Sequence, residues 1–260
     1  MTQVQAYDLD GNPTDRVPLP RLFETPIRPD VIKKAVLTQQ SHRYQPQGRD
    51  PMAGKRTSAE SLGTGLGIAR MARVKGSQHP KARQAAFVPS AVGGRRTHPP
   101  SAEKRIYQRI NKNERRLAIR SAIAATSRKS LVASRGHLVE EVPSLPLVVS
   151  DAIQEIKTSK EAKAVFAKLG LLPDVLRAKK SLKIRAGKGT MRGRRKRHGV
   201  GPLFVVDEDK GLKNAVNNFL GMDVVKVDEL SAELLAPGTS IGRLTIWAVS
   251  AFNKLDEVFV

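Results

Sequence analysis

Four short apolar runs mark the second half of the chain. They are 145–149, 203–206, 224–227 and 244–249, and Trp247 lies in the last of them. Continuous apolar runs of this length, bounded by turn residues, are typical of strands buried on both faces. We therefore expect a strand at each run, buried at 145–149 and 203–206, with Trp247 of the last strand in the core.

Helical patterns separate these runs. Thr158 and Glu161 have the spacing of a capping box, apolar residues recur at helical spacing over 162–169, and Gly170 follows. A second helix is expected over 212–219. Alternating strands and helices predict an α/β fold, a layered sheet with covering helices.

The first 40 residues also predict regular structure. Residues 3–7 and 14–19 flank Asp10-Gly11-Asn12-Pro13, a strong turn sequence, and should form a hairpin. A helix should open at Pro29 and fade near Gln40, because apolar residues recur there at helical spacing.

The sequence pattern of residues 41–101 indicates neither a helix nor a strand. Eight glycines and six prolines interrupt every period over about 60 residues. So long a loop is uncommon inside a compact domain, and its low apolar content predicts disorder in isolation and order on binding. We expect a globular α/β domain of residues 1–40 and 102–260, from which 41–101 extends as a long internal irregular loop.

Ser101 is a candidate N-cap for a helix after this loop, with Glu103 in its first turn. One face of this predicted helix is apolar and the neighbouring face is basic. Few acidic residues are spaced to form ion pairs with the basic face. A solvated basic face is the alternative to an anion-binding one. The basic stripe consists of Arg105, Arg109, Lys112, Arg116 and Arg120.

Charge identifies the class of partner. The 260 residues contain 46 Lys and Arg against 24 Asp and Glu, a net charge of +22. Residues 41–101 carry eleven basic groups against two acidic ones, and 175–206 carry eleven against none, whereas 207–260 are acidic. Like charges in one segment repel one another unless a polyanion neutralises them, so the implied partner is nucleic acid.

Composition excludes several other classes. Only 4% of residues are aromatic, which argues against a base-stacking sheet surface, and the absence of cysteine excludes disulfides and thiolate chemistry. The five histidines have no metal-ligand spacing, and a solvated or backbone-contacting histidine is expected at each. No leader or membrane-spanning run is evident, so we expect a cytoplasmic protein with no membrane partner, no metal and no cofactor.

Two glycine-rich segments resemble parts of nucleotide-binding motifs, but neither matches a complete motif. Gly187-Lys188 would need a glycine at position 182, where leucine stands, and no apolar strand precedes 63–67. Asp207-Glu208-Asp209 could hold a cation, although a helix N-terminus or a solvated face is favoured. Nothing in the sequence requires an enzyme.

The basic segments suit folded RNA. Glycine lets the backbone approach phosphates, and arginine binds phosphate with two parallel hydrogen bonds and stacks on bases. A nuclear-localisation-type run is the alternative for 192–197. The candidate RNA-binding residues are Arg43, Arg49, Lys55, Arg56, Arg70, Arg73, Lys75, Lys81, Arg83, Arg95, Arg96, His98, Arg105, Arg109, Lys112, Arg116, Lys188, Arg192, Arg194, Arg195, Lys196 and Arg197.

Several motifs, in order, resemble one family. They are Gly63-Thr64-Gly65 with Arg70, the run 93–100 (GGRRTHPP), the run 113–122 (NERRLAIRSA), Gly187-Lys188-Gly189 with Arg192-Gly193-Arg194, and Ala236-Pro237-Gly238 before 242–247 (GRLTIW). Together they resemble protein four of the large ribosomal subunit over nearly the whole chain, in its archaeal and eukaryotic form. The chain lacks the long C-terminal extension of eukaryotic members, so the archaeal type is favoured.

The resemblance implies a structural constituent of the large subunit that binds rRNA during assembly. Its globular domain would lie on the outer surface and its loop would reach the peptide exit tunnel. Implied partners are rRNA, neighbouring large-subunit proteins including the other tunnel-constriction protein, and the nascent peptide. The implied tunnel-lining residues are Arg70, Met71, Ala72, Arg73, Val74 and Lys75.

Two other classes stay open from the residues alone. An RNA-modifying enzyme, or another basic RNA-binding accessory protein, would carry similar basic arms, and the enzyme would need a cofactor pocket after an apolar strand. A DNA-packaging protein would bind duplex DNA and folded RNA equally.

Overall fold

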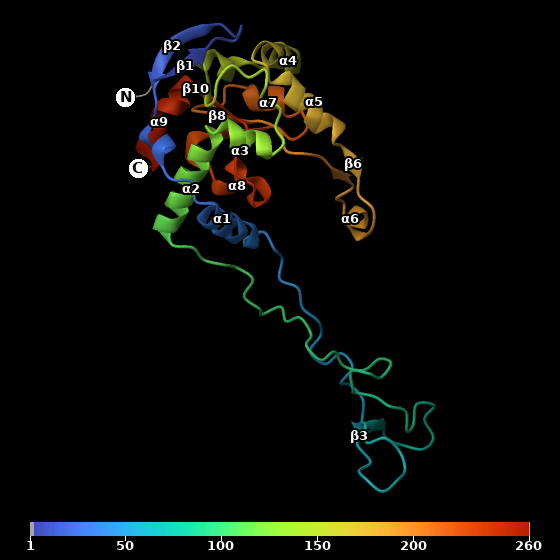
Figure 1. Cartoon of the computed structure of the whole chain (residues 1–260). Helices are drawn as coiled ribbons and strands as arrows, with labels where there is room; N and C mark the ends of the chain where they lie inside the picture. Colours follow the sequence, from blue (N-terminus) through green and yellow to red (C-terminus); the bar gives the residue numbers. More distant parts are fainter. Residues whose placement is uncertain (1–2, 260) are drawn as a thin grey trace. The chain divides into compact units, whose positions relative to one another are not determined.

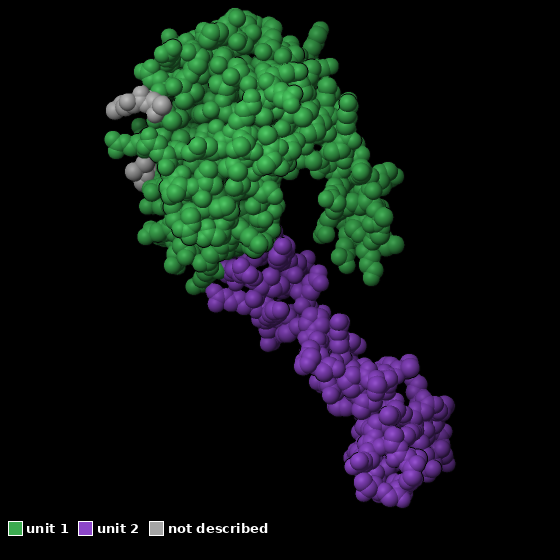
Figure 2. Space-filling view, viewed as in Figure 1, with its two compact units in different colours: residues 1–40, 109–260 green, residues 41–108 purple. Residues whose placement is uncertain are grey.

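The computed structural model describes residues 3–259. Contacts divide the chain into two compact units, residues 1–40 with 109–260 (unit 1) and residues 41–108 (unit 2), which Figure 2 colours separately. Each unit is described by itself.

Unit 1 contains a six-stranded mixed sheet (Figure 1). Its order is β2-β1-β5-β10-β8-β9; β1 pairs antiparallel with β2, and the other neighbours are parallel. The α/β prediction is confirmed. The strands are β1 (Gln3–Tyr7), β2 (Pro13–Pro18), β5 (Leu147–Val149), β8 (Leu203–Val206), β9 (Asp223–Lys226) and β10 (Thr245–Ala248).

Helices cover both faces of this sheet, as the side chains of β8 and β10 show. Phe204 is in register with Ile246, so Trp247 points to the opposite face. Phe204 stacks on Phe166 of α4 (Ser159–Lys168), with ring centroids 5.4 Å apart. Trp247 meets Phe252 of α9 (Val249–Phe259) edge to face at 6.3 Å. Trp247 is fully buried, as its apolar run predicts.

Helix α4 begins where the capping box predicts. The hydroxyl of Thr158 accepts a hydrogen bond from the Glu161 N–H at 3.3 Å. At the other end Gly170 has a φ of +70°, which a residue with a side chain rarely adopts. The predicted helix at 212–219 is shorter, covering Leu212–Val216 as α7.

The remaining elements of unit 1 connect and cover the sheet. The helix predicted from Pro29 is confirmed as α1 (Pro29–Ser41). The other helices and short helical turns are η1 (Arg21–Glu24), α2 (Lys112–Thr126), α3 (Lys129–Ser134), η2 (Asp151–Glu155), α5 (Leu172–Lys180), α6 (Lys188–Met191), η3 (Val227–Glu229), α8 (Ala232–Leu235) and η4 (Pro237–Thr239).

The helix predicted from Ser101 is wrong over its first eleven residues, because α2 begins only at Lys112. Ser101 caps a single turn, in which its hydroxyl accepts from the Glu103 N–H at 3.3 Å. Further along, the Gln108 N–H donates to the Ser41 hydroxyl at 3.0 Å, and His42 Nε2 lies 3.1 Å from the Gln108 carbonyl oxygen. These contacts occupy the backbone groups that a helix would use.

Unit 2 contains little regular structure. Its two strands, β3 (Ala59–Glu60) and β4 (Arg73–Val74), form an antiparallel pair. Among the described residues, the buried hydrophobic core contains none from 41–108. Unit 2 therefore contributes nothing to the core that stabilises the sheet.

No helix within residues 3–259 has the length and apolar character that crossing a bilayer requires.

Candidate nucleic-acid interface

Residues 183–197 form a small basic arm that follows α5. Strands β6 (Lys183–Ile184) and β7 (Lys196–Arg197) pair antiparallel, and the Arg185 N–H donates to the Arg195 carbonyl at 2.8 Å. Between them Gly187, at a φ of +79°, starts the single turn α6. In Figure 1, β6 and α6 lie beyond the end of α5, apart from the sheet and its helices.

The basic arm is an unneutralised cluster of positive charge. All eight of its lysines and arginines are exposed, and none forms an ion pair with an acidic residue within 3–259. No carboxylate occurs anywhere in 175–206. The eight are Lys183, Arg185, Lys188, Arg192, Arg194, Arg195, Lys196 and Arg197.

Both ends of the arm are fixed to α5. Arg177 Nη2 donates to the Val200 carbonyl at 2.7 Å, and the Gly199 N–H donates to the Ser181 hydroxyl at 2.6 Å. The Ser181 hydroxyl in turn donates to the Ala178 carbonyl at 2.6 Å. These bonds hold the strand that leaves the arm against the helix that enters it.

A buried ionic network holds Arg177 in place. Asp174 is fully buried on α5 and accepts from Arg177 Nε at 2.8 Å. His137 Nδ1 lies 2.9 Å from the second carboxylate oxygen of Asp174. The expectation of a solvated or backbone-contacting histidine is wrong at position 137, because a distant acid reaches it through the fold; no spacing in the sequence pairs the two.

Burial and hydrogen bonding shift the pKa values of this network. Desolvation lowers the pKa of His137, more than the neighbouring carboxylate raises it. Burial alone would raise the pKa of Asp174, but hydrogen bonds from His137 and Arg177 outweigh it, and the pKa lies below its usual value. The network therefore holds an ionised carboxylate beside a neutral imidazole, whose Nδ1 carries the proton.

Arg243 supports the segment that follows the arm. It is 1% exposed and donates to the carbonyls of Gly201 at 3.0 Å and Gly221 at 3.1 Å. Nη2 also pairs with the carboxylate of Asp223. Desolvation by burial lowers the pKa of Arg243. This arginine therefore organises the fold and does not face nucleic acid.

Unit 2 is the second strongly basic surface. It carries thirteen lysines and arginines against three carboxylates. Two pairs are internal, Arg56 with Asp50 and Lys75 with Glu60. The candidate RNA-binding residues in 43–98 differ in how exposed their side chains are. Lys81 is exposed, whereas Arg73 is half-buried. The Arg95 guanidinium lies 5.9 Å from the centroid of the Phe87 ring.

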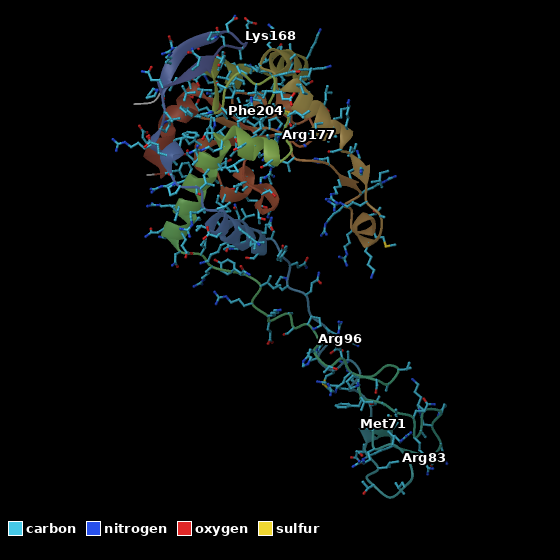
Figure 3. The ribbon with its side chains drawn as sticks, viewed as in Figure 1. Met71, Arg83, Arg96, Lys168, Arg177 and Phe204 are labelled. Carbon is cyan, nitrogen blue, oxygen red and sulfur yellow. The ribbon has the colours of Figure 1, made fainter. Side chains whose placement is uncertain are left out.

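The segment 70–75 divides into half-buried and exposed positions. Arg73 and Val74 pair with Glu60 and Ala59, and Arg73 Nη1 donates to the Arg83 carbonyl at 2.9 Å. Arg70, Met71 and Lys75 are exposed. Figure 3 labels Met71 and Arg83 in this part of unit 2. The exposed surface here is therefore presented by Arg70, Met71 and Lys75.

The predicted basic helix stripe is only partly assembled. Lys112 and Arg116 are exposed on α2, whereas Arg105 and Arg109 precede the helix. Arg120 Nε donates a hydrogen bond to the Phe259 carbonyl, so this guanidinium is partly used within the fold. The helix thus presents a shorter cationic surface than its sequence period predicts.

The acidic C-terminal segment is accounted for locally. Asp209 accepts from the N–H groups of Gly211 and Lys213 at the start of α7, the favoured helix N-terminal interpretation. Asp207 pairs with Lys254 at 2.6 Å. In the part of the chain that the structure describes, no group of three or more His, Asp or Glu is placed to hold a metal ion.

Comparison with known proteins decides the family. The model of the ribosomal protein L4/L1 family matches residues 17–258. The chain belongs to the ribosomal protein L4/L1 family. It is similar to large ribosomal subunit protein uL4 of Methanosphaera stadtmanae, 51% identical with 100% of this chain and 98% of that protein covered.

Two further members of the L4/L1 family are similar over nearly their whole length. Large ribosomal subunit protein uL4 of Methanopyrus kandleri is 48% identical, covering 98% of each chain. The protein of the same name from Saccharolobus islandicus is 45% identical, covering 96% of this chain and 92% of the relative. These archaeal relatives confirm the resemblance and give no support to the RNA-modifying alternative.

Proposed function

We propose that this chain is a structural constituent of the large ribosomal subunit and binds its rRNA. The observation that carries the proposal is the basic arm, whose eight exposed cations have no acidic partner within the described residues. An exposed cluster of one sign is stabilised when phosphates replace its counterions. Membership of the L4/L1 family supports the ribosome as the site of this binding.

The fixed base of the arm supports binding to folded RNA. Because Arg177 and Ser181 hold residues 199–200 against α5, the arm's charges are presented from a stable body and not from a frayed tail. Glycines at 187 and 193, both at positive φ, shape the turn without side chains. The cations can thus follow the irregular backbone of folded RNA.

Unit 2 is the second rRNA-binding element of the proposal. Residues 41–101 would be an insertion in a domain of 1–40 and 102–260 and would extend through rRNA to the peptide exit tunnel. There Arg70, Met71 and Lys75, the exposed members of 70–75, would face the nascent peptide and the neighbouring tunnel protein. Candidate rRNA contacts in this insertion include Arg43, Arg49, Arg83, Arg96 and His98.

Co-sedimentation tests the proposed function. Tagged protein expressed in an archaeal host should sediment with cytoplasmic large subunits and stay bound after a high-salt wash. Substituting three of the arm's cations, Arg192, Arg194 and Arg195, should weaken incorporation, while substituting three exposed lysines outside the arm, Lys160, Lys163 and Lys213, should not. Protein that sediments free of the large subunit would contradict the proposal.

Crosslinking tests the placement of the tip. A photoreactive amino acid at Met71 should crosslink to a stalled nascent chain, whereas the same group at Lys163 of α4 should not. Crosslinks from Lys163 alone would place the tip elsewhere.

A further inference from the structure

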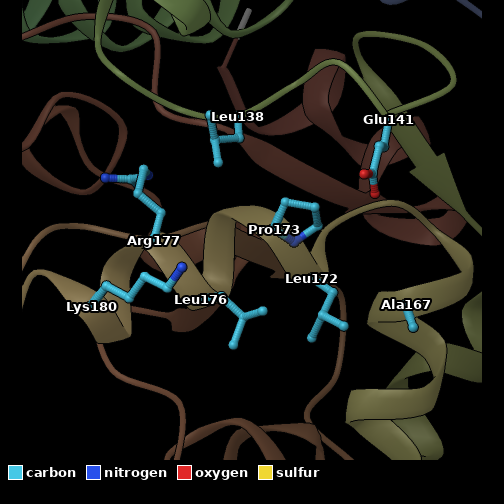
Figure 4. A pocket seen from close by; sticks show the side chains of 8 residues that line it. All are labelled: Leu138, Glu141, Ala167, Leu172, Pro173, Leu176, Arg177 and Lys180. Carbon is cyan, nitrogen blue, oxygen red and sulfur yellow. The ribbon is translucent and has the colours of Figure 1, made fainter.

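An apolar cavity of about 600 Å³ lies beside α5, close to the base of the arm (Figure 4). Two leucines in its wall are strongly exposed for their type, Leu138 at 45% and Leu176 at 43%. Such a cavity is of the size that holds a small organic ligand. Its walls are Leu138, Glu141, Ala167, Leu172, Pro173, Leu176, Arg177 and Lys180.

The cavity is held open by the fold. The Leu138 N–H donates to Asp174 at 3.0 Å, which ties one wall to the buried network of α5. Gly170 lets the backbone of Glu141 approach closely, since a Cβ there would lie 2.3 Å from the Glu141 carbonyl oxygen. The segment from Leu138 to Glu141 is therefore fixed against α4 and α5, and binding needs little reorganisation.

Two opposite charges line the cavity without pairing. Within residues 3–259, neither the carboxylate of Glu141 nor the ammonium of Lys180 has a recorded hydrogen bond or ion pair. Arg177 differs, because its guanidinium is occupied by Asp174 and the Val200 carbonyl. Figure 4 shows Glu141 and Lys180 on opposite sides of the apolar wall formed by Leu172, Pro173 and Leu176.

We propose that this cavity binds one unstacked guanine of RNA, an inference that rests on the proposed function. The leucines and Pro173 would cover the faces of the base, and the ammonium of Lys180 would bind its phosphate. The two oxygens of Glu141 would accept the N1–H and the 2-amino group of guanine. Guanine alone presents two adjacent N–H donors on this edge; adenine and cytosine present one amino group, and uracil has one N–H between carbonyls.

Charge and position favour RNA over an apolar peptide. Lys180 and Arg177 begin the acid-free segment 175–206 that becomes the basic arm, so the cavity is continuous with the proposed RNA interface. Folded RNA exposes single bases from loops and bulges, and proteins bind them by stacking and by their Watson–Crick edges. An apolar peptide would cover the exposed leucines but would offer the carboxylate of Glu141 no hydrogen-bond donor.

The test measures binding of the full chain to short oligouridines that carry one central guanosine or adenosine, by fluorescence anisotropy. Guanosine should bind about tenfold more tightly than adenosine, as one two-bond contact to a base edge provides. Glu141→Gln should abolish this preference, because the amide offers one oxygen acceptor where the carboxylate offers two. Glu140→Gln, at an exposed neighbour outside the cavity, is the matched control and should keep the preference.

A second variant fills the cavity without touching the core. Ala167 is exposed on α4 and lines the cavity, so Ala167→Trp should also remove the guanosine preference. Ala164→Trp, exposed one turn earlier and outside the cavity, should keep it. Equal affinity of the unaltered protein for both oligomers, or a preference that survives Ala167→Trp, overturns the inference.

The same assay separates this inference from the proposed function. If neither the oligomers nor a folded rRNA fragment binds, the RNA-binding function itself fails; if the folded fragment binds and no oligomer does, the function stands and the guanine site is wrong. If all bind equally and binding falls when the arm's arginines are replaced, the function stands and the guanine site is wrong. This last pattern, together with capture of an apolar peptide that Ala167→Trp blocks, would assign the cavity to protein.

Discussion

Nδ1 of His137 lies 2.9 Å from the carboxylate of Asp174, and both side chains are buried in unit 1. The residues are 37 positions apart in sequence. Through Arg177, which bonds both Asp174 and the Val200 carbonyl, the pair is connected to the base of the basic arm. An interaction in the interior thus fixes a surface that we propose to bind RNA.

Acidification should destabilise the protein through His137. Burial lowers the pKa of His137 in the folded protein below its ordinary 6.5. Just below pH 6.5 the unfolded chain therefore binds a proton at this histidine more readily than the folded protein does. The stability contributed by neutral His137 is fully present above pH 6.5 and is lost as the pH falls toward the lowered pKa. The free energy of unfolding in urea should therefore decrease below pH 6.5.

A substitution isolates this histidine. In His137→Asn the side-chain amide can replace the Nδ1–H donor but does not titrate, so the free energy of unfolding should vary less as the pH falls below 6.5. His79→Asn, at an exposed position in unit 2, should keep the full dependence. Identical pH profiles for the unaltered protein and His137→Asn would assign the effect to other groups. Asp174 adds a loss of the same sign at lower pH, below 3.8.

Removing the buried carboxylate should be costly. Asp174→Ala leaves the guanidinium of Arg177 and the Leu138 N–H without their partner, and we expect a loss of roughly 3 to 5 kcal/mol in the free energy of unfolding. Asp10→Ala, which removes an exposed ion pair with Lys168, should lose at most about 1 kcal/mol. Chemical denaturation measures both; similar losses would show that the buried network adds no special stability.

Unit 1 should fold without most of unit 2. The Arg49 N–H donates to the Pro100 carbonyl at 2.9 Å, so the chain enters and leaves this part of unit 2 at one place, and a short Gly–Ser linker can replace residues 48–98. Because the buried core includes no described residue of 41–108, the shortened protein should keep a cooperative thermal transition. Incorporation into large subunits should fall. Loss of the transition would contradict the assignment of 41–101 as an insertion.

Three arginines of the arm should act on RNA affinity and not on stability. Arg192, Arg194 and Arg195 are exposed and have no acidic partner among the described residues, so replacing all three by alanine should leave the melting temperature unchanged. If each contacts one phosphate, the slope of log affinity against log salt should fall by about two to three units. Binding titrations over a salt series measure the slope.

The control replaces three exposed lysines outside the arm, Lys160, Lys163 and Lys213. These lie on α4 and α7, in parts of unit 1 where acidic residues are interspersed. Their loss changes net charge equally but should change the salt slope little. Equal effects of the two triple variants would mean that net charge, and not the arm, determines binding.

Local signals made much of unit 1 predictable. The apolar runs became the buried strands β5, β8 and β10 and the half-buried edge strand β9, and Thr158 caps α4, because these features depend on neighbours a few residues apart. The start of α2 was not predictable in this way. Ser41 and His42 take up the backbone groups of Gln108 from 66 or more positions away, and no helical period records such a contact.

By itself, the sequence determined the α/β class, the positions of the buried strands and the partner implied by its segregated charge, since hydrophobic period and net charge are properties of the chain. Tertiary structure alone decided which of those charges are free. It buried Arg243 and tied Arg177 to Asp174 and His137, but left the arm's cations without acidic partners among the described residues. Pairing and desolvation depend on which distant segments the fold brings together, and the order of residues does not contain those distances.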